Sequence, residues 1–185
     1  MSDNLLTERM PFFQKQKRRL KINIATPSYG SRYSGNYVRS LYSLLTTAND
    51  FDVGFSLSDV DYADVAVSRN YLISHFFYNK QDSDYILMID DDMGFHSDLI
   101  YKMLEFDKDV VGVIAPQRCI DLQKLHSLSG MEFSEAFARS CSFVGKVVDD
   151  FGNGFFEVDS CGAGILMISR VCIEKMVEKC PEIVD

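Results

Sequence analysis

Apolar and polar residues follow one another in blocks along this chain, and the blocks predict alternating strands and helices. Apolar residues at helical spacing predict helices at 36–49, 65–78, 97–106 and 170–179. Short apolar runs predict strands at 21–26 (ended by Pro27), 51–57, 85–89 and 109–115. Strand–helix–strand order at this spacing implies right-handed parallel crossovers, so we expect an α/β fold with a mostly parallel central sheet flanked by helices.

Other segments do not fit this alternation. Residues 1–20 are polar and end in a basic cluster, which predicts a flexible arm or a contact with a membrane surface or acidic partner. Residues 117–141 have weak periodicity and predict a long functional loop or lid. Residues 142–149 and 154–159 predict two strands joined by a turn at 150–153, a small antiparallel element near the C-terminus.

The most informative stretch is 84–94, in which the apolar run 85–89 stops at Asp90, Asp91 and Asp92. A short, wholly apolar run is typical of a strand buried on both faces, and open α/β sheets bind ligands at the carboxyl ends of such strands. If the chain stays extended, Asp90 and Asp92 point to one side, with their Cα atoms about 7 Å apart. A divalent cation bound to phosphate suits that pair, while an ordinary acidic turn is the alternative.

Composition limits the classes of function. The 185 residues carry a net charge of -8, which argues against a nucleic-acid partner and means that an anionic substrate needs a metal or a few placed cations. Five cysteines without a C-x-x-C pair favour reduced thiols and a cytoplasmic location. The sequence shows no run of 18 apolar residues, so we expect no transmembrane segment.

Further candidate ligand contacts lie outside the acidic stretch. Residues 27–35 form a turn-rich loop after the first strand, without G-x-G-x-x-G or a P-loop pattern. Arg69 lies near the start of a predicted helix, where anions bind, although a structural surface arginine is the alternative. Gly162 and Gly164 allow either close approach of a ligand or a tight packing bend.

Taken in order, these segments resemble the nucleotide-sugar-dependent glycosyltransferases of the GT-A fold, near the large family 2 group. The similarity covers about residues 22–176. It depends on the strand 22–27, the segment Ser68-Arg69-Asn70, the Asp90-Asp91-Asp92 match to the DXD motif, and the Gly-Ala-Gly core within 158–170. The resemblance implies a single GT-A-like (Rossmann-like) domain over residues 21–185.

The resemblance also implies roles for individual residues. Asp92 would be the main metal ligand, for Mn²⁺ or Mg²⁺, and Asp90 would contact the ribose or reach the metal through water. Asp91 would support the turn, and Arg69 would hold the base or the diphosphate. The base of a UDP- or GDP-linked donor would meet the loop after the first strand, where the donor-binding residues would be Thr26, Pro27, Tyr29 and Arg32.

Enzymes of this group usually carry a later Glu-Asp pair, whose Asp deprotonates the acceptor hydroxyl, and often a metal-binding His. The sequence has no such pair after Met176. We therefore expect either that the chain is a fragment or that the general base is supplied from elsewhere, with Glu157 and Asp159 as its nearby candidates.

The function implied is transfer of a sugar from a nucleoside diphosphate to a hydroxyl of a glycan, lipid or protein. Two alternatives stay open. A sugar-phosphate nucleotidyltransferase would want a glycine- and arginine-rich loop after the first strand, where this chain offers Gly30 and Arg32. A non-catalytic nucleotide-sugar-binding module would keep the donor site without the base. The sequence does not indicate the oligomeric state.

Overall fold

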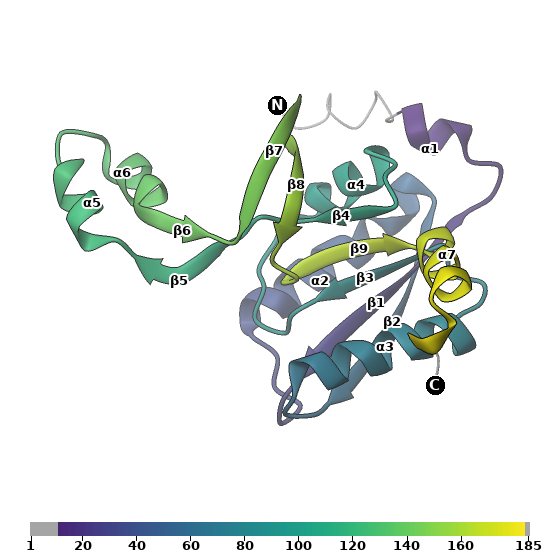
Figure 1. Ribbon diagram of the computed structural model, residues 1–185. Helices are drawn as coiled ribbons and strands as arrows, with labels where there is room; N and C mark the ends of the chain where they lie inside the picture. Colours follow the sequence, from purple (N-terminus) through teal and green to yellow (C-terminus); the bar gives the residue numbers. More distant parts are fainter. Residues whose placement is uncertain (1–10, 184–185) are drawn as a thin grey trace. The chain divides into compact units, whose positions relative to one another are not determined.

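The computed structural model describes residues 11–183, and its central feature is a five-stranded sheet. Figure 1 shows its strands side by side, in the order β2-β1-β3-β9-β4. The strands are β1 (Leu20–Ser28), β2 (Val53–Asp61), β3 (Tyr85–Ile89), β4 (Val110–Gly112) and β9 (Ile165–Ser169). The first three strands run parallel to one another, whereas β9 runs antiparallel to β3. The predicted mixed α/β architecture with a mostly parallel central sheet is confirmed.

Helices cover both faces of this sheet. On one face, side chains of α3 (Val65–Asn79) and α7 (Arg170–Lys179) form a buried cluster with β1 and β3, in which Phe76 and Ile86 are fully buried. On the other face α2 (Gly35–Thr46) is joined to β1 by the Tyr37 and Thr26 hydroxyls, 2.7 Å apart. The Tyr101 hydroxyl of α4 (Ser97–Glu105) donates to the Leu44 carbonyl oxygen of α2.

Short helical segments complete this part of the chain. They are α1 (Pro11–Lys15), the 3-10 helix η1 (Ala48–Phe51) and the 3-10 helix η2 (Pro181–Ile183). The helix predicted at 36–49 is therefore two elements, α2 and η1. The helix α4 is capped by the side chain of His96, which accepts from the Asp98 N–H, while Ser97 is buried in the first turn.

Pro27 does not end the first strand, contrary to the prediction. The pairing of β1 with β3 stops at Ala25, but its pairing with β2 continues to Ser28, with Pro27 opposite Val60. Proline lacks a backbone N–H, so it is tolerated in a strand where one side of the ladder has ended. The strand predicted at 109–115 is shorter than expected, because β4 spans Val110–Gly112.

By its internal contacts the described chain divides into two compact units. The first contains the five-stranded sheet and its helices, and the second is Gly112–Ala163. The second holds β5 (Pro116–Ile120), α5 (Leu122–Ser127), α6 (Phe133–Ser140), β6 (Cys141–Phe143), β7 (Gly145–Gly152) and β8 (Phe155–Cys161). The predicted loop at 117–141 is therefore wrong, since two helices and a strand pair occupy it.

Within the second unit, the predicted antiparallel element is confirmed as the hairpin of β7 and β8. Its turn is tighter than expected and centres on Asn153, which has φ 55° between Gly152 at 77° and Gly154 at 83°. Three successive residues with positive φ suit a tight turn in which two are glycine. A second antiparallel pair, β5 with β6, encloses α5 and α6.

Part of the predicted N-terminal arm, residues 1–10, lies outside the described residues. Two arginines of the basic cluster contact the amino ends of the strands. Arg18 pairs with Asp84, and Arg19 donates to the Val53 carbonyl oxygen at 2.8 Å. These two cations are therefore bound to the sheet, and the strand β1 follows them directly.

Two further expectations concern membranes and disulfides. Between residues 11 and 183, no helix has the length and apolar character needed to span a bilayer. All five cysteines are free thiols.

Arg170 joins α7 to the end of α3. Its guanidinium donates to three carbonyl oxygens, those of Ser83 (2.7 Å), Phe76 (3.1 Å) and Lys80 (2.6 Å). It also lies 4.2 Å from the centroid of the Phe76 ring. The Phe76 and Lys80 carbonyl oxygens also accept from the Lys80 and Ser83 N–H groups, at 3.2 and 2.9 Å, so the guanidinium adds a charged donor at the end of the helix, where carbonyl groups lack intrahelical partners.

We expect Arg170→Met to lower the free energy of unfolding by about 2–4 kcal/mol, because three carbonyl oxygens lose a charged donor. The measurement is urea denaturation at pH 7. Lys175→Met, on the same helix, removes an exposed pair with Asp109 (3.3 Å) and should cost less than about 1 kcal/mol. Equal losses from the two substitutions would contradict the assignment.

Candidate functional site

The acidic stretch lies at the carboxyl end of β3, at the edge of the sheet where β1 and β2 also end. The chain turns immediately after Ile89, and the Met93 N–H donates to the Asp90 carbonyl oxygen at 3.1 Å. The expectation that Asp90 and Asp92 lie on one extended strand is therefore wrong. A turn carries the three carboxylates, because the chain leaves the sheet as soon as the apolar run ends.

Two neighbouring segments hold this acidic turn (defined as Asp90–Asp92) in place. The Asp90 N–H donates to the Gly164 carbonyl oxygen at 2.9 Å, and the Ser34 N–H donates to the Asp91 carbonyl oxygen at 2.9 Å. A Cβ added to Gly164 would lie 3.3 Å from the Met93 Sδ, so a glycine lets the chain after the turn pack closely. For Gly164, the structure favours the packing explanation.

Arg69 reaches the acidic turn from α3. Its Nη2 lies 2.7 Å from Oδ1 of Asp90, and the two side chains are 24% and 31% exposed. The N-terminus of α3 is capped by the Asp64 carboxylate, which accepts from the Ala66 and Val67 N–H groups at 2.8 and 3.1 Å. The first helical N–H groups are thus occupied, and the cation that this helix offers to an anion is Arg69. The structure brings together two residues predicted to contact the donor.

The predicted base-binding residues fall into two groups that differ in their exposure to solvent. Thr26 and Pro27 are buried, with the Thr26 hydroxyl bonded to Tyr37, so they support the loop from within. Tyr29 is 72% exposed and Arg32 is also exposed. These last two are the members of the set that a ligand in solvent can reach.

Two carboxylates at the end of β2 belong to this edge and were not predicted. Asp59 accepts from the Tyr33 hydroxyl at 3.1 Å. Asp61 accepts from the Gly30 N–H and the Ser31 hydroxyl, both at 2.8 Å, and so fixes a loop in which both residues have positive φ. The signal in the sequence is the pair of acids spaced two apart at the end of the second predicted strand, which places them on one face.

Glu157 and Asp159 lie on β8, in the unit Gly112–Ala163, while the acidic turn lies in the other unit. Their spacing of two along the strand puts both on one face of the hairpin, and both are exposed. The Ser160 hydroxyl donates to Asp159 at 2.9 Å. Their assignment as a general base stays a prediction.

The acidic turn carries the two carboxylates predicted to hold a metal ion, Asp90 and Asp92. Among residues 11–183, no group of three or more His, Cys, Asp or Glu side chains is placed to hold a metal. Mg²⁺ commonly uses one or two carboxylates together with substrate phosphates, and Asp90 and Asp92 supply that number. A metal held by these two carboxylates would need further ligands from a bound phosphate or from water.

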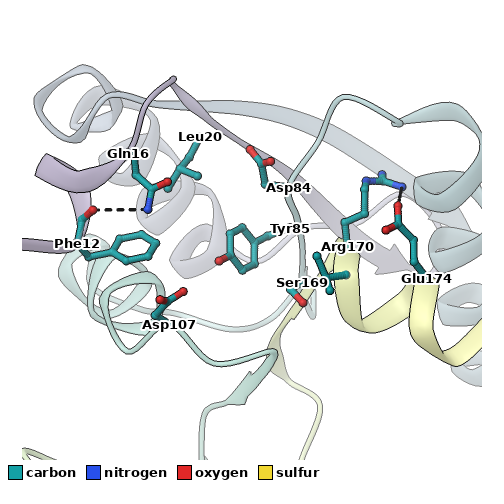
Figure 2. Close-up of a pocket in the computed structure, with 10 residues that line it drawn as sticks. Phe12, Gln16, Leu20, Asp84, Tyr85, Asp107, Ser169, Arg170 and Glu174 are labelled. Atoms are coloured by element: carbon teal, nitrogen blue, oxygen red, sulfur yellow. Dashed lines mark hydrogen bonds and ion pairs between the residues drawn. The ribbon is translucent and has the colours of Figure 1, made fainter.

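A separate pocket of about 310 Å³ lies at the amino ends of β1 and β3. Figure 2 shows the Tyr85 ring near its middle, with Phe12 and Asp107 on one side and Arg170 on the other. Burial, and then the neighbouring Asp107, raise the pKa of Tyr85. The acidic turn is at the other end of β3, so this pocket is not part of the candidate site.

No protein-family model and no curated protein matches the sequence. Among solved structures, A197 from STIV is similar at 19% identity and TM-score 0.49, over 84% of this chain and 68% of that one. The 4-diphosphocytidyl-2C-methyl-D-erythritolsynthase of Anaerococcus prevotii DSM 20548 is similar at 10% identity and TM-score 0.43, over 88% and 77%.

A third similar structure is a glycosyltransferase involved in the glycosylation of the major capsid of PBCV-1. It has 11% identity and TM-score 0.35, over 86% of this chain and 66% of that one. All three similarities are low, so the chemistry of this chain is inferred from its own residues.

We expect Tyr37→Phe to change how stability depends on pH. Burial raises the pKa of Tyr37 above that of the unfolded chain, about 10. The folded protein therefore keeps this proton to higher pH, and the free energy of unfolding falls as pH rises above about 10. Tyr37→Phe has no phenol proton at this position, so its free energy of unfolding should fall less steeply above about pH 10. It also costs about 1–2 kcal/mol at pH 7, because the buried Thr26 hydroxyl loses its partner.

Urea denaturation between pH 7 and pH 11 makes this measurement. The control is Tyr42→Phe, on the same helix, whose ring is 71% exposed and which should behave as the wild type. A stability difference between wild type and Tyr37→Phe that stays constant through pH 11 would contradict the role of the buried hydroxyl.

Proposed function

We propose that this chain binds a nucleoside diphosphate sugar at the carboxyl edge of β1, β2 and β3 and transfers the sugar to a hydroxyl acceptor. The observation that carries the proposal is the ion pair that Arg69 forms with Asp90 of the acidic turn. Arg69 contacts Asp90, and Asp92 follows in the same turn, at the edge where parallel α/β sheets bind their ligands. This supports one cation for phosphate and two carboxylates for a metal. A protein with a net charge of -8 needs such a local arrangement to hold an anion.

Each part of the edge has a proposed task. Tyr29 and Arg32 are exposed on the loop after β1, where the base of a UDP- or GDP-linked donor would lie. Arg69 would bind the diphosphate, since guanidinium groups pair with phosphate through two parallel hydrogen bonds. Asp90 and Asp92 would hold Mg²⁺ or Mn²⁺, which supplies positive charge to the departing diphosphate.

The acceptor side of the reaction needs a group that removes the hydroxyl proton. Glu157 and Asp159 are the carboxylates proposed for this task, and both are exposed to solvent on β8. The acceptor would be a hydroxyl of a glycan, lipid or protein. If neither carboxylate acts, the same edge would still bind the donor, and the chain would serve as a nucleotide-sugar-binding module.

We expect one of UDP and GDP to bind in the presence of Mn²⁺, and Asp92→Asn to weaken that binding by at least about tenfold, or ~1.4 kcal/mol. The physical reason is that the amide keeps the side chain's size but removes a negative ligand from the metal. Isothermal titration calorimetry with each nucleotide, with and without Mn²⁺, makes the measurement.

The matched control is Asp50→Asn, because Asp50 is an exposed residue of η1, before the amino end of β2. It carries the same change of charge at the opposite edge of the sheet and should bind as the wild type. Equal nucleotide affinity in wild type and Asp92→Asn would remove the metal from the proposal. Binding without transfer or hydrolysis of the matching donor would favour the binding module.

A further inference from the structure

Arg69 occupies one of the two carboxylates that the proposed metal would use. Its Nη2 lies 2.7 Å from Oδ1 of Asp90, within charge-assisted hydrogen-bond distance. The guanidinium of arginine is a permanent positive charge in proteins. A metal ion that approaches Asp90 therefore has to displace a fixed positive charge or accept its repulsion at close range.

The surroundings make this ion pair stronger than one at the surface. Its two side chains are 24% and 31% exposed, compared with 49% and 70% for the ion pair of Lys21 with Asp82. Charges that are partly withdrawn from water are screened less by solvent and salt. Both partners also start from fixed backbone, since Asp90 is bound to Gly164 and α3 is capped by Asp64.

We infer that Arg69 is an internal counter-ion that keeps metal ions off the acidic turn until a diphosphate is present. This inference rests on the proposed function. A diphosphate offers the guanidinium more negative charge than one carboxylate does, and so draws Arg69 from Asp90. Asp90 then becomes available to the metal, and the metal and the nucleotide each raise the affinity of the other by the same factor.

The inference gives Arg69 two effects of opposite sign. Removing its charge should weaken nucleotide binding, because the diphosphate loses a partner. The same change should strengthen the binding of metal alone, because Asp90 loses its competitor. A residue that only supported the fold would weaken both, so the sign of the metal effect separates the two roles.

The experiment titrates Mn²⁺ into the full chain and follows free Mn²⁺ by electron paramagnetic resonance, without nucleotide and then with UDP or GDP. For the wild type we expect weak binding of Mn²⁺ alone and about tenfold tighter binding with the nucleotide. For Arg69→Met we expect about five- to tenfold tighter binding of Mn²⁺ alone, and a nucleotide effect below about threefold.

The control is Arg18→Met, which also removes an arginine from an ion pair with an aspartate, here Asp84 at the amino end of β3. It should bind Mn²⁺ as the wild type does. Arg69→Gln provides a second variant that keeps a hydrogen-bond donor without charge, and thermal unfolding followed by circular dichroism checks that each variant is folded.

The inference is overturned if folded Arg69→Met and Arg69→Gln bind Mn²⁺ alone no more tightly than the wild type. If the wild type still binds the Mn²⁺–nucleotide pair in that case, the proposed function stands and only the counter-ion role fails. If the wild type binds neither nucleotide at any Mn²⁺ concentration, the proposed function fails, and the coupling inferred for Arg69 fails with it.

Discussion

Strand β3 has to be apolar over its length, because it lies between two strands and under helices on both faces. Ile86, Leu87 and Ile89 are fully buried and Met88 is 3% exposed. Unpaired charges are too costly in such a position, so carboxylates can begin only where the strand leaves the sheet. This constraint places the acidic residues at the edge of the sheet where the loops after β1 and β2 also begin. It therefore determines where a polar ligand site can form.

Main-chain hydrogen bonds fix the backbone of the acidic turn. Backbone groups of Ser34 and Gly164 secure Asp91 and Asp90 from two sides, and their own segments belong to the start of α2 and the approach to β9. The side chain of Asp90 adds the ion pair with Arg69 to these main-chain bonds. Such a turn can change its side-chain partners while its backbone stays in place.

Periodicity predicted the elements well because burial on one face or two leaves a direct mark on the sequence. The strand at 85–89 and the helix at 170–179 have the bounds observed for β3 and α7. Contacts between distant segments were harder to predict. The local sequence pattern does not show that β9 pairs antiparallel with β3, or that Arg69 contacts Asp90, 21 positions away in the sequence. The family resemblance assigned Thr26 to the base of the donor, whereas the structure shows its hydroxyl bonded to the Tyr37 hydroxyl inside the protein.

The unit Gly112–Ala163 departs from the sheet after β4 and returns at β9, and these two strands are neighbours in the sheet. An insertion whose ends are held by adjacent strands can be lengthened, shortened or replaced at little cost to the framework, since closing a loop depends only weakly on its length. The candidate general base lies inside this exchangeable segment, and the acidic turn lies outside it. Sequence changes in Gly112–Ala163 can therefore accumulate while the sheet and the acidic turn keep their structure.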